Sequence, residues 1–206
     1  MGIVGGLIIH RTGCYQELIW VGMVLMTLGV GLFINIGAFT PLGEILGYEV
    51  VMGIGAGLVF NPPLIAIQAL VAQDDVATAT AAQSFLRNLG MSVGLVVGGV
   101  IIQNGMSKRT GDLRAAGLSP ASLSDFTGGD AAANVDQIGR ITNSGQRQAV
   151  QEAFAWSLRQ MWIVMVALTA VGLLASAFIT KAVLSKEHTE TKTGIKEKQE
   201  ETSQQS

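Results

Sequence analysis

The chain has 206 residues, of which 49% are hydrophobic and only 14% are charged, and its net charge at pH 7 is -2. Soluble domains usually carry about 25% charged residues, so this composition argues against water as the only solvent, and the small net charge gives no electrostatic basis for a nucleic-acid partner. The single cysteine, Cys14, excludes an internal disulfide, and the histidines His10 and His188 lie far apart. The sequence also lacks a P-loop pattern and a Ser-His-acid set, so we predict no catalytic residue, cofactor or metal site.

The first nine residues are apolar but too few to cross a membrane. As a helix they would extend only about 13 Å, whereas the hydrocarbon core is about 30 Å thick. Two interpretations are open: an interfacial segment, or the end of a span that begins outside this chain. We favour the second, and assign residues 1–13 to the end of a truncated span and a cytoplasmic loop.

Four segments without Asp, Glu, Lys or Arg are long enough to cross a bilayer. They are Leu18–Ile36, Val50–Ala72, Asn88–Ser107 and Gln160–Thr180. A soluble protein would need amphipathic helices to cover such segments, and no further amphipathic helices are predicted. The sequence therefore predicts an all-α integral membrane protein, with three transmembrane helices within residues 14–107 (about 18–36, 47–72 and 84–107) and a last one at 160–183.

The positive residues of the short loops predict the orientation of the spans. Arg11, Arg87 and Lys181 fall on one side if the spans alternate, and that side should be cytoplasmic. Residues 108–159 form a loop too long to obey this rule, and we place it outside the cytoplasm. Its Gly-, Ala- and Ser-rich part, 111–145, predicts a loosely ordered cap, and helical spacing from Gln146 predicts a short interfacial helix. Residues 184–206 read as a disordered cytoplasmic tail.

The second span contains two adjacent prolines near its middle, Pro62 and Pro63. Proline has no N–H, so the carbonyls of Leu58 and Val59 lose their helical donors and need partners within the protein or in a watery cavity. Transporters often build their binding sites at such helix breaks near the membrane midplane.

The polar residues beside this break are candidates for lining a substrate path. Asn61 and Gln68 are seven residues apart, Pro62 lies between them, and Gly57 and Gly53 continue the same stripe. An equally open interpretation is that Asn61 only satisfies the interrupted backbone and that the glycines only allow close packing.

The third span carries a glycine at every fourth position, which predicts close contact with another helix. These glycines are Gly90, Gly94 and Gly98.

Two charged residues lie beside the uncharged segments. Arg87 could reach lipid phosphates or pair with Asp74 or Asp75 in the preceding loop, and the sequence does not separate these alternatives. Glu49, just before the second segment, is the candidate for proton exchange.

Three stretches in this order resemble a known transporter family. They are Gly5-Gly6-x-x-x-x-Arg11-x-Gly13, Gly53-x-Gly55-x-Gly57-x-x-Phe60-x-Pro62-x-x-Ala66-x-Gln68, and Ala81-x-x-Ser84-Phe85-x-Arg87-x-x-Gly90-x-x-x-Gly94. Together with the long outer loop they resemble the major facilitator superfamily, specifically the fourteen-span drug:proton antiporter branch common in fungi. The resemblance covers about residues 1–183, and it implies that Gly5, Arg11 and Gly13, with Arg87 of the third stretch, are cytoplasmic motif residues.

The resemblance implies that the four spans correspond to the eleventh to fourteenth helices of such a carrier, so the chain is its C-terminal fragment. The full-length parent would be a multi-pass protein of the plasma membrane or the vacuolar membrane that exports drugs or toxins in exchange for protons by alternating access. Four helices supply only part of one bundle, so this chain alone should not transport. The alternative is a non-transporting membrane protein that assembles through its glycine stripes.

Overall fold

The computed structural model describes residues 15–129, 131 and 133–178. Within these residues, helices and short 3-10 turns form all the regular secondary structure. Four helical segments are long and apolar enough to cross a membrane: Gln16–Asn35, Leu42–Gln68, Gln73–Lys108 and Ser144–Ser176. The predicted all-α membrane architecture is therefore confirmed. The predicted motif residues Gly5, Arg11 and Gly13, and the tail after residue 178, lie outside the described residues.

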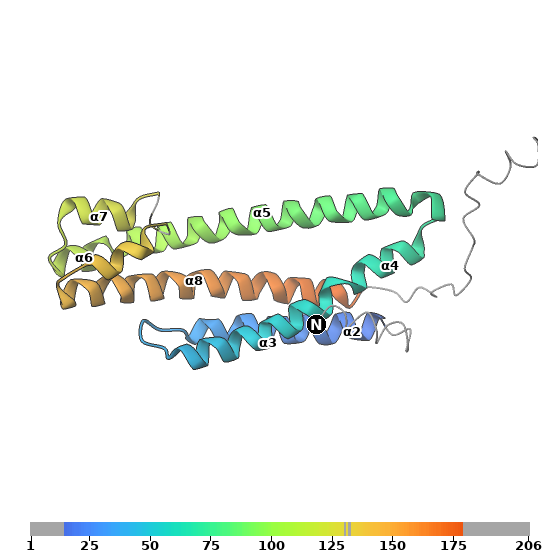
Figure 1. Cartoon of the computed structure of the whole chain (residues 1–206), viewed down its shortest axis with the longest axis horizontal. Coiled ribbons are helices and arrows are strands. Elements are labelled where there is room, and N and C mark those ends of the chain that lie inside the picture. The colour runs from blue at the N-terminus through green and yellow to red at the C-terminus, as the bar shows by residue number, and fades with distance from the viewer. Residues whose placement is uncertain (1–14, 130, 132, 179–206) are drawn as a thin grey trace, which may run out of the picture.

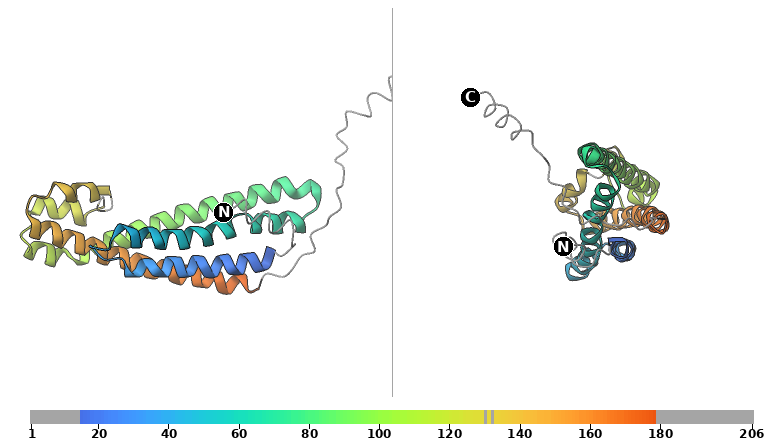
Figure 2. Two further views of the ribbon diagram at one scale, coloured as in Figure 1. Left: turned by 60° about the horizontal axis from the view of Figure 1, so that its bottom comes forward. Right: turned by 90° about the vertical axis from the view of Figure 1, so that its right-hand side faces the viewer.

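The helices follow one another with short connections and form an elongated bundle (Figures 1 and 2). In chain order they are α2 (Tyr15–Leu32), η1 (Phe33–Asn35), α3 (Leu42–Phe60), α4 (Pro62–Leu70), η2 (Gln73–Asp75), α5 (Val76–Lys108), α6 (Thr110–Ala115), α7 (Pro120–Thr127), η3 (Ala133–Arg140) and α8 (Ser144–Ser176). In Figure 1, α5 and α8 run together at the end where α6 and α7 lie, and α4 lies toward the opposite end of α5.

Several helices extend beyond the uncharged segments. α3 begins at Leu42, directly after Pro41, and so includes Glu44 and Tyr48, which are hydrogen-bonded to each other one turn apart. The short interfacial helix predicted from Gln146 is continuous with the last span, because α8 runs without interruption from Ser144 to Ser176. Charged and polar side chains do not interrupt a helix, so the length of an apolar window is a lower bound on the length of the helix.

Glycines bring α2 and α3 into close contact. A methyl group on Gly29 would lie 2.5 Å from the Cα of Met52, and one on Gly22 would lie 2.6 Å from a side-chain methyl of Val59. On α3, Gly55 faces the backbone of Met26 in the same way. Because glycine has no side chain, the backbones of α2 and α3 can lie close together at these positions. Close packing of this kind is a common basis of helix association in membranes.

The helix α8 packs against α2 and η1 on one side and against α5 on the other. At one end, the indole N–H of Trp20 donates a hydrogen bond of 3.0 Å to the carbonyl of Ser176. Near the middle of α8, the rings of Trp162 and of Phe33 in η1 stack with their centroids 4.6 Å apart. Toward the cap, α8 also crosses α5 closely at Gly105, where an added methyl group would lie 2.6 Å from the Oγ of Ser157.

Beyond this crossing, α6, α7 and η3 fold against the first turns of α8, and we call these three elements the cap. Their apolar side chains form a core of their own with α5 and α8, which consists of Met106, Leu113, Leu118, Leu123, Phe126, Ala131, Ile138, Val150, Ala153 and Phe154. Phe126 and Phe154 meet edge to face at 6.3 Å. The prediction of a loosely ordered cap is wrong, because all of its large apolar residues except Val135, which is 46% exposed, belong to this one core or pack against it.

Much of the apolar surface is uncovered. Leu95 is 79% exposed and Phe85 is 66% exposed, both on α5. Soluble monomers rarely expose contiguous apolar faces of this kind, whereas lipid or further transmembrane helices would cover them.

Candidate functional site

The candidate site is the interruption between α3 and α4. The helix α3 ends at Phe60, Asn61 follows, and α4 begins at Pro62, as the two prolines predict. Asn61 keeps helix-like dihedral angles, φ -93° and ψ -37°, and its carbonyl accepts a hydrogen bond of 3.1 Å from the N–H of Ile65. The interruption is therefore a kink at which Pro62 starts a new helix, and at this first position its missing N–H removes no hydrogen bond within α4.

Packing fixes the short helix α4 on the side of α2. Pro62 is fully buried, and Ala66, one turn further along, is 9% exposed. Ala66 forms a small apolar cluster with Ile19 and Met23 of α2. The kink is thus held inside the protein and does not stand in open space.

A side-chain hydrogen bond ties the far end of α4 to α5. The Nε2 of Gln68 donates to the Oγ1 of Thr80 at 3.1 Å. Both groups are partly buried, so this bond satisfies polar atoms that would otherwise face apolar surroundings. The Gln68 amide, predicted to line a path, is therefore directed at least in part toward a neighbouring helix.

A second contact ties α5 to the end of α3. The guanidinium carbon of Arg87 lies 3.6 Å from the centre of the Phe60 ring, within the range of a cation–π interaction. The pairing of Arg87 with Asp74 or Asp75, considered from the sequence, is not formed; Arg109 and Asp112 do form an ion pair, near the other end of α5. Asp75 is twelve residues before Arg87, which is about 18 Å along a helix and beyond side-chain reach.

These two contacts clamp the kink from both sides. Phe60 precedes Asn61 and Gln68 follows it, and their partners Arg87 and Thr80 are seven residues apart, on one face of α5. The helix α5 therefore contacts the chain on both sides of the kink.

The other predicted path residues are not brought to the kink. Glu49 lies on an exposed part of α3, about 18 Å along the helix axis from Asn61. Gly53 is exposed with open space beside it, and Gly57 is partly buried. The proton-exchange role of Glu49 and the path-lining role of the stripe remain predictions.

Of the three regularly spaced glycines of α5, only Gly98 lies close to another described helix. A methyl group on Gly98 would lie 3.4 Å from the sulfur of Met161 on α8, whereas Gly90 and Gly94 have no atom within 4 Å of that position. The tighter crossing with α8 is at Gly105, which the four-residue spacing did not single out. A close-packing role for Gly90 and Gly94 remains a prediction for a partner outside the described residues.

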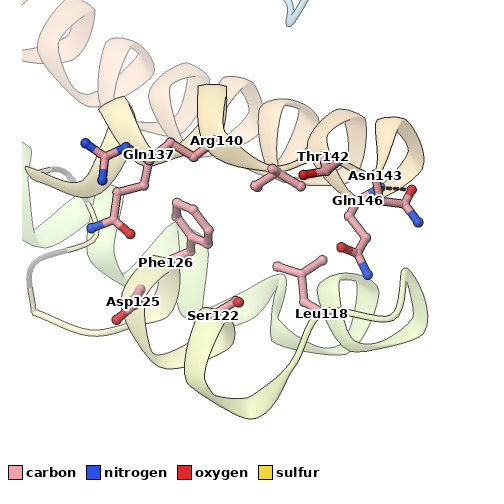
Figure 3. A pocket seen from close by; sticks show the side chains of 10 residues that line it. Leu118, Ser122, Asp125, Phe126, Gln137, Arg140, Thr142, Asn143 and Gln146 are labelled. Carbon is pink, nitrogen blue, oxygen red and sulfur yellow. Dashed lines mark hydrogen bonds between the residues drawn. The ribbon is translucent and has the colours of Figure 1, made fainter.

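A cavity of about 410 Å³ lies in the cap (Figure 3). The ring of Phe126 on α7 faces it, and Asp125, Arg140 and Gln146 line its rim. The cap begins at the end of α5, so this cavity is about 30 Å from Arg87 along that helix. It is separate from the kink, and it contains charges of both signs.

Comparison with known proteins gives relatives among fungal transporters. The chain is 38% identical over 190 residues to an MFS-type transporter of Metarhizium majus. The aligned region covers 92% of this chain and 32% of that protein. It is 36% identical over 190 residues to an efflux pump of Dothistroma septosporum, with coverage of 92% and 32%. It is 30% identical over 203 residues to the acurin A biosynthesis cluster MFS-type transporter of Aspergillus aculeatus, with coverage of 94% and 35%.

The chain spans about a third of the length of these relatives. No model of a protein family matches it. The comparison with solved structures found no match. The four apolar helices and the relationship along nearly the whole chain agree with each other, and they identify the chain as homologous to about one third of a fungal transporter of the major facilitator superfamily.

Proposed function

We propose that this chain is the C-terminal part of a proton-coupled efflux transporter for small organic molecules, and that the full-length parent works by alternating access. Relatives named as transporters and efflux pumps match 92% or more of the chain, which supports this proposal. In the parent, proton binding from outside and substrate binding from the cytoplasm would favour opposite orientations of one site. The plasma membrane is the proposed location, with both ends of the chain in the cytoplasm.

The observation that carries the proposal is the clamped kink between α3 and α4. Interrupted helices in membranes are tolerated where they are buried in protein or line a cavity, and transporters use them for substrate and ion sites. Here Pro62 is buried, while Phe60 remains 54% exposed beside it. The kink thus packs into the bundle at Pro62, and we place the substrate path beside the half-exposed Phe60 ring and the partly buried Asn61.

The proposal assigns separate tasks along α3 and α4. Asn61 and Gln68, on either side of Pro62, contribute polar groups to the path. Glu49, nearer the outer end of α3, exchanges the proton. The contacts of Gln68 with Thr80 and of Phe60 with Arg87 would then be remade when the parent changes orientation, because α5 holds both sides of the kink.

A chimera tests the proposal. Residues 1–206 replace the matching third of the Metarhizium majus relative, and a fluorescent drug is loaded into yeast cells that lack their own pumps. We expect the chimera to lower drug retention when a proton gradient is present, and the chain expressed alone to leave retention unchanged. A chimera that reaches the cell surface and extrudes nothing would contradict the transport proposal. Efflux by the chain alone would favour a self-sufficient assembly over a fragment.

A further inference from the structure

Arg87 carries a positive charge with no compensating group in the described part of the chain. Its guanidinium forms no ion pair and donates no hydrogen bond there, and its contact is with the Phe60 ring. From Asn88 to Ser107, α5 contains no charged residue, and α4 contains none either. Charged groups in such surroundings are usually paired or mark a functional site.

The guanidinium retains its hydrogen-bonding capacity. Its N–H groups point away from the central carbon, so contact with a ring on one side leaves donors in the guanidinium plane available. Two parallel N–H groups match the two oxygens of a carboxylate, and this geometry makes arginine the preferred partner of planar anions.

Phe60 adds an apolar surface to this charge. Although Arg87 covers part of the ring, Phe60 is 54% exposed. The ring belongs to the last residue of α3, next to Asn61. A ligand that contacts Arg87 therefore also meets an aromatic surface and a polar residue at the kink.

We propose that Arg87 and Phe60 form a subsite for aromatic organic anions, compounds with a carboxylate or phenolate on a planar ring. The anionic group accepts hydrogen bonds from Arg87, and the ring packs against Phe60. A cationic drug would be repelled, and a lipid phosphate would use the charge without the ring. This inference rests on the proposed function for its meaning as a substrate subsite.

Binding of 2-naphthoate to the 206-residue chain tests the subsite. The chain is placed in nanodiscs of neutral phosphatidylcholine, and binding is followed by naphthalene fluorescence. Saturable binding is expected, and 2-naphthylmethylammonium, with the same ring and the opposite charge, should bind at least about tenfold more weakly. Equal affinity for both probes, or no saturable binding of 2-naphthoate, would overturn the proposal.

Matched variants locate the binding. Arg87→Gln should raise the Kd for 2-naphthoate at least about tenfold, and Phe60→Leu should raise it about threefold or more. Arg87→Lys keeps the charge without the planar fork, so its Kd should lie between those of the wild type and Arg87→Gln. Lys108→Gln makes the same charge change at the other end of α5 and should leave the Kd unchanged. An equal effect of Lys108→Gln and Arg87→Gln would show general charge attraction and overturn the subsite.

Two further measurements separate the remaining outcomes. Circular dichroism must show equal helicity for the variants, and recovery of affinity in Arg87→Lys would exclude misfolding as the cause of the loss. Native mass spectrometry in phosphatidylserine nanodiscs measures lipid adducts; if Arg87→Gln loses phosphatidylserine and retains 2-naphthoate, the site serves lipid phosphate and the proposal is wrong. Because binding is measured on this chain and efflux on the chimera, failure of the subsite and failure of the proposed function are distinguishable.

Discussion

Adding one methyl group at Gly105 should loosen the bundle. The new methyl would lie 2.6 Å from the Oγ and 2.7 Å from the Cβ of Ser157, which is fully buried on α8. The two helices must separate by about 1 Å, and overpacking of this kind typically costs about 1–3 kcal/mol. Alanine recovers up to about 1 kcal/mol through its higher helix propensity. We therefore expect Gly105→Ala to destabilise the chain by up to about 2 kcal/mol.

The same substitution on the same helix provides the control. Gly94 has open space where a methyl group would be placed, so Gly94→Ala should leave the stability unchanged or raise it by up to about 1 kcal/mol. Thermal unfolding of the purified chain in detergent, followed by circular dichroism, gives an apparent Tm for each variant. Adding Ser157→Gly to Gly105→Ala removes the two nearest atoms and should restore part of the lost stability. Equal Tm values for Gly105→Ala and Gly94→Ala would refute the close crossing of α5 and α8.

Three other predictions follow from the structure. Gln68→Leu should cost about 0.5–1.5 kcal/mol, and a double-mutant cycle with Thr80→Val should show coupling; strictly additive effects would count against their hydrogen bond. Phe126→Ala should destabilise the cap by about 3 kcal/mol and speed its limited proteolysis, whereas an unchanged cleavage rate would argue against a packed cap core. A tag after Ser206 should be protected from external protease in intact cells, because the C-terminal end is expected to lie in the cytoplasm. Cleavage of the tag from outside would contradict this topology.

The membrane helices could be predicted because their signal is local. Each apolar segment has the length required by the bilayer, and no partner needs to be known to recognise it. The kink at Pro62 was predictable for the same reason, since the missing N–H belongs to the residue itself. The start of α3 was not, because Glu44 continues a helix outside the apolar window. A helix was predicted from Gln146, but not that it would run without interruption into the last span.

The contacts between helices depend on partners that the sequence does not name. A four-residue glycine spacing shows that close approach is possible along Gly90 and Gly94, but not that another helix lies there. The glycines that do meet a neighbour include Gly29 on α2 and Gly105 on α5, which belong to no short repeat. The cap core was missed for a related reason: its apolar residues are spread among Gly, Ala and Ser without helical or strand periodicity.

In the candidate site, too, the features of the local sequence could be predicted and the contacts between helices could not. Asn61 and Pro62 could be singled out because they interrupt an otherwise continuous helix. The pairing of Arg87 with Phe60 could not, because 27 residues separate them and the contact depends on how α5 packs against the end of α3. From the sequence, Arg87 is a charge beside an apolar segment and part of a family-like stretch, and lipid phosphates, Asp74 and Asp75 are all open as partners.

The most direct test of the account is drug retention in cells that express the chimera with Asn61→Leu. This change keeps the approximate side-chain volume and removes the polar group at the kink. The control is Val96→Leu on the exposed side of α5, where Val96 is 64% exposed. With surface expression matched, we expect reduced efflux or altered substrate preference for Asn61→Leu and unchanged efflux for Val96→Leu. Unchanged efflux and preference in both variants would contradict a role for the kink in the substrate path.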